Sequence, residues 1–363
     1  MIETLNLLRL FDIKGNAVSC EPFGIGHIHD TYLVTTDSFE KYVLQRINHR
    51  IFKDVPALMR NIDAVTRHLA KEERDPRHVL TLIKTKDGGL FFHENETDGY
   101  YRVYRHISDS ICLNRPETPM DLYQSGVAFG RFQRRLAAFP ATTLTETIKR
   151  FHDTPKRYMD FKNAVHEDPM GYAGLVAKEI DFALAREEEA GIMVDMHRRG
   201  ELPTRVTHND TKLNNVMLDA ITREALCVID LDTVMPGLAG NDFGDSIRFG
   251  ASTAEEDEPD QNKVSLSVPL FEAFTKGFLS ACGNSLTESE IRTLPLGAKL
   301  MTLENGIRFL ADYLSGDVYF HVSRPGHNLD RCRTQFALIA DMERKWPELE
   351  KIVETEWKRL SRA

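Results

Sequence analysis

The chain has 363 residues, of which 42% are hydrophobic and 28% are charged. This balance is typical of a globular protein with a large core, and the length favours two domains or lobes. The formal net charge of −9 disfavours nucleic acid as a partner, because phosphate backbones are bound by an excess of Lys and Arg.

Five scattered cysteines without a CxxC spacing argue against a zinc site or a disulfide framework and fit a reducing compartment. The N-terminal stretch carries acids among its apolar residues and has no small-residue cleavage site, unlike a signal peptide. No run approaches the roughly 18 apolar residues that span a membrane. We therefore expect a cytoplasmic protein with no membrane contact, either a monomer or a weak homodimer.

The first hundred residues carry short β-type runs separated by turn signals. The expected strands are Ala17–Phe23, Thr31–Thr35, Lys41–Ile47, Val79–Lys84, Leu90–Phe92 and Tyr100–His106. The fourth and fifth are expected to form a hairpin. Within Pro56–Ala70, apolar residues recur at spacings of three and four, which predicts an amphipathic helix.

After Ile107 the pattern changes to helices, with one β-rich segment at Arg205–Asp232. The expected helices are Asp121–Phe139, Gly174–Arg199, Thr287–Ser315 and Arg333–Leu360. The acidic stretch 254–263 is expected to be a solvated loop. The chain is therefore predicted to have a β-rich N-terminal lobe (residues 1–106) and a larger, mostly helical C-terminal lobe (residues 107–363).

The β-rich segment contains a motif with the spacing of a kinase catalytic loop. Asp210 is followed five residues later by Asn215, and a hairpin then leads to Asp230. We expect Asp210 to orient an attacking hydroxyl and accept its proton. Asn215 and Asp230 supply the oxygen ligands that Mg²⁺ prefers. Asp232 is either a further metal contact or a solvated neighbour.

Several segments together resemble the aminoglycoside phosphotransferase and choline kinase superfamily, and within it the N-acetylhexosamine 1-kinases. The segments are 24–32 (GIGHIHDTY), 207–215 (THNDTKLNN), 229–233 (IDLDT), 244–250 (GDSIRFG) and 308–314 (RFLADYL). The resemblance implies an α+β, protein-kinase-like bilobal fold, with one main helix packed on a small antiparallel sheet. It also implies ATP- and Mg²⁺-dependent phosphorylation of the anomeric C1 hydroxyl of N-acetylglucosamine or N-acetylgalactosamine, a step of carbohydrate metabolism.

The nucleotide is expected at a glycine turn between two strands, where backbone N–H groups can approach phosphate oxygens. An ordinary hairpin turn is the alternative. The strand that should carry a phosphate-pairing Lys has Gln45 and Arg46 instead, on opposite faces, and the helix offers only Asn61 or Asp63 as a partner. A hinge near Tyr104 should contact adenine. The expected ATP-binding residues are Gly24, Gly26, Gln45, Arg46, Tyr104, His106 and Ile107.

At the acceptor end, His29 and Asp30 follow the glycine turn and can face a sugar-sized substrate beside Asp210. The resemblance also implies Arg308 and Tyr319 as sugar contacts, although an Arg on a long helix often covers only its own surface. Asp245 either touches the substrate or holds the catalytic loop through backbone N–H groups.

Two alternatives remain open at this point. One is a kinase for a cationic acceptor, either an amino-alcohol or an aminoglycoside, which would require acidic residues around the acceptor. The other is a catalytically dead nucleotide-binding module, whose only support is the missing strand Lys.

Overall fold

The computed structural model describes residues 6–24, 28–95 and 98–360. The chain forms two compact units. The sheet unit comprises residues 1–111, 138–149 and 217–235, and the helical unit comprises residues 112–137, 150–216 and 236–363. The chain therefore passes between the units several times. The boundary between residues 106 and 107 stays a prediction.

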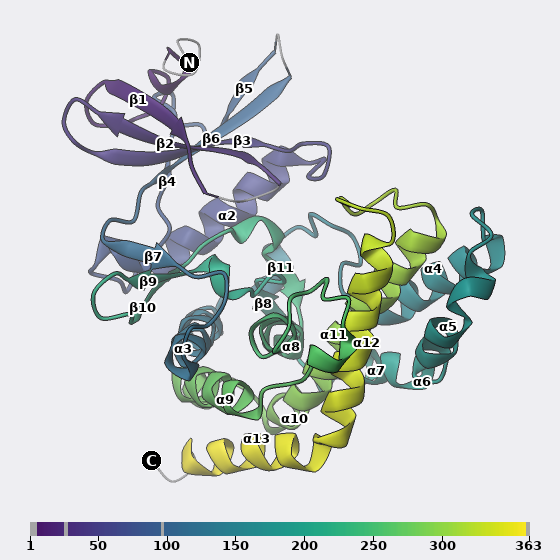
Figure 1. Ribbon diagram of the computed structural model, residues 1–363. Helices are drawn as coiled ribbons and strands as arrows, with labels where there is room; N and C mark the ends of the chain where they lie inside the picture. The colour runs from purple at the N-terminus through teal and green to yellow at the C-terminus, as the bar shows by residue number, and fades with distance from the viewer. Residues whose placement is uncertain (1–5, 25–27, 96–97, 361–363) are drawn as a thin grey trace. The chain divides into compact units, whose positions relative to one another are not determined.

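The sheet unit contains an antiparallel six-stranded sheet in the order β1-β2-β3-β6-β4, with β5 also paired to β6 (Figure 1). The strands are β1 (Ala17–Pro22), β2 (Asp30–Thr36), β3 (Lys41–Ile47), β4 (Leu82–Ile83), β5 (Phe92–Glu94) and β6 (Gly99–Arg105). Leu8, Phe11, Val34, Leu44 and Val103 form a fully buried cluster against this sheet. Burial of this cluster provides the hydrophobic free energy that holds the sheet together.

The predicted hairpin between Val79–Lys84 and Leu90–Phe92 is wrong in its pairing. The turn forms, since the Thr85 N–H donates to the Gly89 carbonyl at 2.9 Å, but β4 and β5 each pair with β6. The seven-residue β6 offers one long edge, and the two short strands occupy successive parts of it.

The main helix of the sheet unit is α2 (Val55–Ala70), as predicted. It begins where the Asp54 carboxylate accepts the Ala57 N–H at 2.9 Å, with Pro56 in the first turn. A second sheet, in the order β10-β9-β7, holds β7 (Ser110–Cys112), β9 (Val216–Asp219) and β10 (Ala225–Val228). The β9–β10 pair is the predicted hairpin that leads to Asp230.

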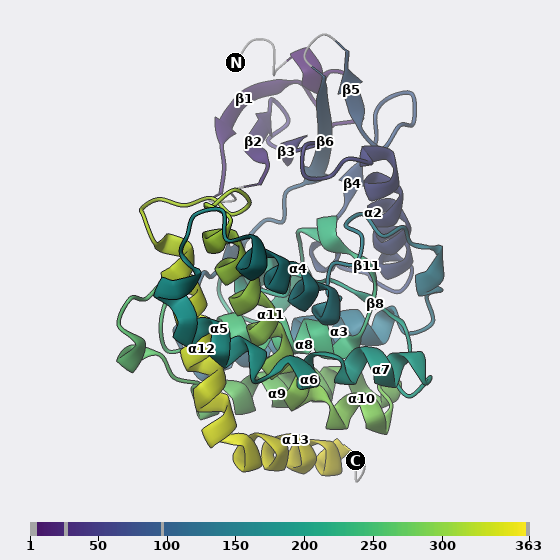
Figure 2. The same cartoon turned by 90° about the vertical axis from the view of Figure 1, so that its right-hand side faces the viewer.

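The helical unit contains one short strand pair, β8 (Arg205–Thr207) with β11 (Met235–Gly237), of which Met235 belongs to the sheet unit. In this unit α11 contacts α4, α8 and α12, and α13 contacts α9, α10 and α11 (Figure 2). Its helices are α3 (Pro119–Arg135), α4 (Thr154–Glu167), α5 (Ala177–Leu184), α6 (Glu187–Ala190), α7 (Ile192–Arg198), α8 (Ala239–Gly250), α9 (Val268–Cys282), α10 (Glu288–Arg292), α11 (Leu294–Leu314), α12 (His327–Arg344) and α13 (Trp346–Leu360).

Three of the predicted long helices are broken. Residues 174–199 form α5, α6 and α7, residues 287–315 form α10 and α11, and residues 333–360 lie in α12 and α13. Pro295 and Pro347 stand at the second positions of α11 and α13, where the missing N–H is tolerated. Proline cannot continue a preceding helix, so these residues set the two later breaks.

Glycines allow α8 and α11 to approach each other closely. A Cβ at Gly244 would lie 2.3 Å from the Gly297 carbonyl oxygen, and one at Gly297 would lie 2.2 Å from the Gly240 oxygen. Helix α8 carries residues of the candidate site, so this close contact sets the position of those residues relative to α11.

Across the described part of the chain, no helix is both long and apolar enough to cross a membrane. The five cysteines are free, and all except Cys112 are buried.

Candidate active site

The loop that carries Asp210 is held by the carboxylate of Asp242 on α8. This side chain accepts the His208 and Asn209 backbone N–H groups at 2.9 and 2.8 Å and the Gln133 side-chain amide at 2.8 Å. Burial raises the pKa of Asp242, although the two backbone donors oppose this. Asn209 has a left-handed φ of 63°, so the loop needs such contacts to keep its shape.

The side chain of Asp210 is 26% exposed, somewhat less than that of its neighbour Lys212. Its Oδ1 lies 3.0 Å from Lys212 Nζ, and its Oδ2 accepts the Asn215 side-chain amide at 3.1 Å. Burial raises the pKa of Asp210, but the Lys212 ammonium together with His208 and the Asn215 amide outweighs it, so the net pKa is lowered. The carboxylate is thus ionised and oriented, as a proton acceptor must be.

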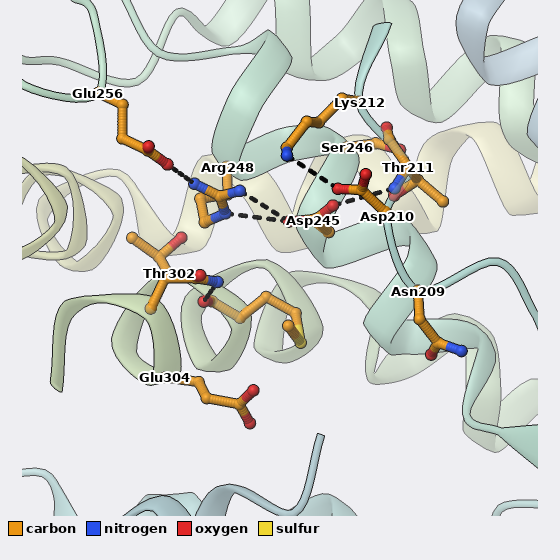
Figure 3. Close-up of polar contacts among 12 residues, drawn as sticks. Asn209, Asp210, Thr211, Lys212, Asp245, Ser246, Arg248, Glu256, Thr302 and Glu304 are labelled. Atoms are coloured by element: carbon orange, nitrogen blue, oxygen red, sulfur yellow. Dashed lines mark hydrogen bonds and ion pairs between the residues drawn. The ribbon is translucent and has the colours of Figure 1, made fainter. Parts of the chain in front are cut away.

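A chain of ion pairs joins the catalytic loop to the acidic stretch 254–263. Asp245 accepts the Thr211 N–H at 3.0 Å and pairs with Arg248 at 2.9 Å, and Arg248 pairs with Glu256 at 2.7 Å (Figure 3). Asp245 therefore makes the hydrogen bond to a backbone N–H of the catalytic loop that the holding alternative requires. The stretch is a largely exposed loop, as predicted, but it is not solvated throughout, because Glu256 lies against the buried Arg248.

The two residues predicted as magnesium ligands, Asn215 in the helical unit and Asp230 in the sheet unit, each offer an oxygen donor, and their binding of one shared ion stays a prediction. Asn215 donates its amide nitrogen to the Asp210 carbonyl at 2.8 Å, and among the described residues nothing donates to its Oδ1. Asp230 is exposed at the start of a single helical turn and has a left-handed φ of 60°. Both are hard oxygen donors, and Mg²⁺ takes only one or two such ligands from protein. No cluster of three or more His, Cys, Asp or Glu side chains that would hold a metal occurs in the described ranges.

Arg308 on α11 lies among aromatic rings in the helical unit. Its guanidinium carbon is 5.7 Å from the Phe151 ring centroid, 5.9 Å from Tyr319 and 5.4 Å from Phe320. No carboxylate of the described residues lies within ion-pair distance of it. Burial lowers the pKa of Arg308, and the Glu304 carboxylate only partly opposes this. The structure thus brings the two predicted sugar contacts, Arg308 and Tyr319, together.

One helical turn before Arg308, the fully buried Glu304 connects α11 to the catalytic loop. His152 Nδ1 lies 2.9 Å from Glu304, its Nε2 lies 3.4 Å from the Asn209 carbonyl oxygen, and Thr154 donates to Glu304 at 2.8 Å. Burial raises the pKa of Glu304, but His152, Arg308 and Thr154 together outweigh it and the net pKa is lowered. These contacts link the helix that carries Arg308 to Asn209, the residue before Asp210.

In the sheet unit, Gln45 faces a buried arginine that sequence reasoning missed. Arg102 on β6 donates to Gln45 Oε1 at 2.9 Å and binds both oxygens of Asp232 at 2.5 and 2.6 Å. Asp232 is buried, so its prediction as a solvated neighbour is wrong. Burial would raise the pKa of Asp232, but the Arg102 guanidinium holds it well below its usual range.

His29 also contacts Asp232, at 3.1 Å through Nε2, and its Nδ1 accepts the Asn48 N–H at 3.0 Å. Its side chain is 5% exposed, and its contact with the acceptor stays a prediction. Asp30 is exposed at the start of β2, where it stands opposite Arg46 of β3. Strand alternation places Arg46 on the face opposite Gln45.

Of the remaining nucleotide residues, Gly24 has a φ of +79° that favours glycine, and Gly26 lies outside the described residues. Tyr104 is buried beneath Arg102, at 5.2 Å from ring centroid to guanidinium. Burial lowers the pKa of His106, and the Ile107 carbonyl accepts the Ser110 hydroxyl at 2.7 Å. The adenine contacts of this hinge stay predictions.

The two helix residues considered as substitutes for a Glu partner are used elsewhere. Asn61 donates to the Thr145 and Val234 carbonyls, and Asp63 pairs with Arg67 at 2.7 Å. The sequence offered one indication that Arg102 is important, because it is a charged residue in the middle of a tyrosine-rich strand. Its partner Asp232 could not be read from spacing, because the two are 130 positions apart.

A family model described as APH, phosphotransferase enzyme family, matches residues 19–266. Among solved structures, the chain is similar to an aminoglycoside phosphotransferase from Alicyclobacillus acidocaldarius, with 13% identity and a TM-score of 0.60 over 95% of this chain and 94% of that one. It is also similar to a microcompartment-associated aminopropanol kinase, with 19% identity and a TM-score of 0.56 over 96% and 98%.

A third similar structure is an amicoumacin kinase in complex with AMP-PNP, Ca²⁺ and its ligand, with 13% identity and a TM-score of 0.62 over 93% and 92% of the two chains. At these identities the likeness is one of fold. It confirms the predicted class, a protein-kinase-like α+β fold with an antiparallel sheet in the N-terminal region and helices in the C-terminal region.

Proposed function

Because the chain belongs to the APH phosphotransferase enzyme family, we propose that it transfers the γ-phosphoryl group of ATP to the anomeric hydroxyl of an N-acetylhexosamine. The observation that carries the proposal is the state of Asp210, an ionised and partly exposed carboxylate held between Lys212 and Asn215. This is the arrangement that a direct transfer to a hydroxyl requires.

In the proposed reaction, Asp210 Oδ1 or Oδ2 accepts the hydrogen bond of the acceptor C1 hydroxyl and takes its proton as the oxygen attacks the γ-phosphorus. The bond between that phosphorus and the β,γ-bridging oxygen breaks opposite the attack, and ADP leaves with its electron pair. Since little covalent chemistry falls to the protein, positioning of the hydroxyl is the main contribution of Asp210.

Asn215 Oδ1 and the Asp230 carboxylate would hold Mg²⁺. The ion would neutralise charge that develops on the phosphate oxygens. Lys212 adds a fixed positive charge 3.0 Å from Asp210, which keeps the carboxylate ionised before the transfer.

The surroundings of Arg308 support a neutral acceptor. A guanidinium without a carboxylate partner repels ammonium groups but donates well to hydroxyl and carbonyl oxygens. Aromatic rings beside it, at Phe151, Tyr319 and Phe320, can cover the apolar face of a sugar or an acetyl methyl group. An N-acetylhexosamine offers all of these features.

A cationic acceptor would fit better if unpaired acids lay near the site. The acidic stretch was the only cluster that the sequence offered, and four of its five acids have basic partners. Glu255 pairs with Arg115, Glu256 with Arg248, Asp257 with His327 and Glu258 with Lys263. Three similar structures are named as kinases or phosphotransferases of an aminoglycoside, an aminopropanol and amicoumacin. Cationic acceptors are therefore included in the experiment below.

The test is ATP consumption with Mg²⁺ against N-acetylglucosamine, N-acetylgalactosamine, glucose, ethanolamine and an aminoglycoside, with the product position read by ³¹P NMR. We expect an anomeric phosphate from the N-acetylated sugars. Turnover with the cationic acceptors alone would contradict the sugar assignment and keep the phosphotransferase.

A matched pair of variants tests the acceptor site. Arg308→Met should raise KM for the sugar and leave KM for ATP unchanged. Arg292→Met, at an exposed arginine of α10, is the control and should change neither constant.

A further inference from the structure

The sheet unit contains a row of hydrogen-bonded polar side chains that crosses three strands, partly buried at Thr31 and Gln45 and fully buried at Arg102. Thr31 of β2, Gln45 of β3 and Arg102 of β6 are successive partners in the strand register. Gln45 donates to the Thr31 hydroxyl at 3.1 Å and accepts from Arg102 Nε at 2.9 Å. The row ends at Asp232, whose carboxylate accepts hydrogen bonds from both terminal nitrogens of Arg102.

Arg102 has little capacity left for a phosphate. Its side chain is 1% exposed, with the Met59 sulfur 4.0 Å from Nη1 and the Tyr104 ring 5.2 Å from the guanidinium carbon. Its three nitrogens already donate to Gln45 and to both Asp232 oxygens. A buried, doubly hydrogen-bonded arginine–carboxylate pair is rigid, and removing one partner leaves an uncompensated charge.

Asp232 has a third hydrogen-bond partner, because His29 Nε2 also contacts its Oδ2. The Asn48 N–H can only donate, so His29 Nδ1 accepts from it and the neutral ring carries its proton on Nε2, facing Asp232. Asp232 thus receives three donors in total. A carboxylate so occupied has little room for a metal ion.

What the pair does hold is the turn that begins at Asp230. Leu231–Thr233 form a single 3₁₀ turn with Asp230 at its N-cap, and the Val234 N–H closes it on the Leu231 carbonyl at 3.2 Å. The left-handed φ of Asp230 is unfavourable for a residue with a side chain, so contacts elsewhere must maintain it. One such contact of this turn is the doubly hydrogen-bonded pair of Asp232 with Arg102.

We infer that Arg102 is a positioning residue for the metal-binding carboxylate of Asp230, acting through Asp232 and without contact to the nucleotide. The inference rests on the proposed function for the assignment of Asp230 to the metal. Strand β3 has Gln45 and Arg46 where a lysine would pair with the phosphates. A buried cation, Arg102, lies instead on the adjoining strand β6, opposite Gln45, and its carboxylate partner Asp232 lies two residues after Asp230.

The test measures ATP affinity by calorimetry, once with Mg²⁺ and once with EDTA, so that it needs no acceptor. Arg102→Met should keep its affinity in EDTA and lose about tenfold or more of the affinity gained with Mg²⁺, as loss of a partner behind a metal ligand does. Arg102→Lys, which keeps the charge, should lose less. Arg60→Met, at an exposed arginine of α2, is the control and should behave like the wild type.

Because Arg102→Met leaves Asp232 buried without its partner, a second variant separates folding from positioning. Arg102→Met/Asp232→Leu replaces both charges by apolar groups and should regain the melting temperature while still lacking the Mg²⁺ gain. Recovery of that gain in the double variant would overturn the inference. Equal losses with Mg²⁺ and EDTA in Arg102→Met would also overturn it, because they indicate a direct phosphate contact.

Failure of the proposed function has a different signature. A wild-type protein that binds ATP more tightly with Mg²⁺ yet phosphorylates no acceptor would contradict the transfer reaction and leave the Arg102 comparison intact. A wild type without any Mg²⁺ gain would overturn the assignment of Asp230 and the inference with it.

Discussion

The carboxylate of Asp242 accepts the backbone N–H groups of two consecutive residues of the catalytic loop, His208 at 2.9 Å and Asn209 at 2.8 Å. Asp210, the next residue, owes its position to this pair of hydrogen bonds. Asp242 is itself fixed on α8, so the geometry of the proposed base depends on a helix residue 34 positions after His208.

Replacing Asp242 should therefore reduce both stability and activity. Asp242→Asn keeps one acceptor oxygen and leaves a buried loop N–H unpaired, which should cost about 2 kcal/mol in the free energy of unfolding. Urea denaturation measures the first effect and kcat the second. Asp195→Asn, at an exposed aspartate of α7, is the control. A variant with wild-type kcat would show that the loop holds its shape without Asp242.

Asp210→Asn should remain folded and lose most of its activity. The amide can still receive a hydrogen bond from Asn215, but it cannot take a proton, and general bases contribute roughly 10²–10⁴-fold. Initial rates at saturating ATP and acceptor, together with the circular dichroism spectrum, check this. Retention of most of the activity would remove Asp210 as the base.

Asn215→Leu should weaken the dependence on Mg²⁺ rather than the binding of free ATP. The leucine side chain has a similar size and lacks both the oxygen proposed for the metal and the amide that donates to Asp210. We expect a higher Mg²⁺ concentration for half-maximal rate and a lower kcat, read from a Mg²⁺ titration at fixed ATP. Unchanged Mg²⁺ dependence would exclude Asn215 as a ligand.

Gly244→Ala should destabilise the helical unit. The new Cβ would lie 2.3 Å from the Gly297 oxygen, so α8 must move away from α11, and such overpacking costs about 1–3 kcal/mol. Thermal unfolding measures the loss, and kcat should fall as Asp242 moves with α8. Gly174→Ala, where a Cβ meets no atom within 4 Å, is the matched control. Equal melting temperatures for the two variants would contradict the close approach of the helices.

The hydrogen bonds of the Asp341 carboxylate should weaken in acid. It accepts from Lys345 at 2.7 Å, the Ser265 hydroxyl at 2.8 Å and the Leu266 N–H at 2.7 Å, and these donors outweigh burial and lower its pKa from 3.8 to about 2. A lowered folded-state pKa stabilises the protein above the unfolded value, here by about 2 kcal/mol, and this contribution is lost as the pH falls from about 4 to about 2.

Denaturation of wild type and Asp341→Asn at pH 7 and at pH 2.5 checks this sign. The difference between their unfolding free energies should be large at pH 7 and shrink in acid. A difference that grows on acidification would show that Asp341 is protonated in the folded protein.

The local order of the chain could be predicted from the sequence alone. Alternating and helical periodicities located β1, β2, β3, β6 and α2, because each depends on neighbours a few residues away. The spacing from Asp210 to Asn215 and on to Asp230 indicated phosphoryl transfer for the same reason, since one loop and one hairpin carry all three.

Tertiary structure decided the partners. The pairing of β4 and β5 with β6, the ion pair of Arg102 with Asp232 and the support of the catalytic loop by Asp242 join residues that no local pattern connects. Whether an acid in a loop is solvated, as expected for Glu256, or lies against a buried guanidinium depends on which helix folds beside it. Burial and charge pairing are properties of the packed chain, whereas periodicity and spacing are properties of its sequence.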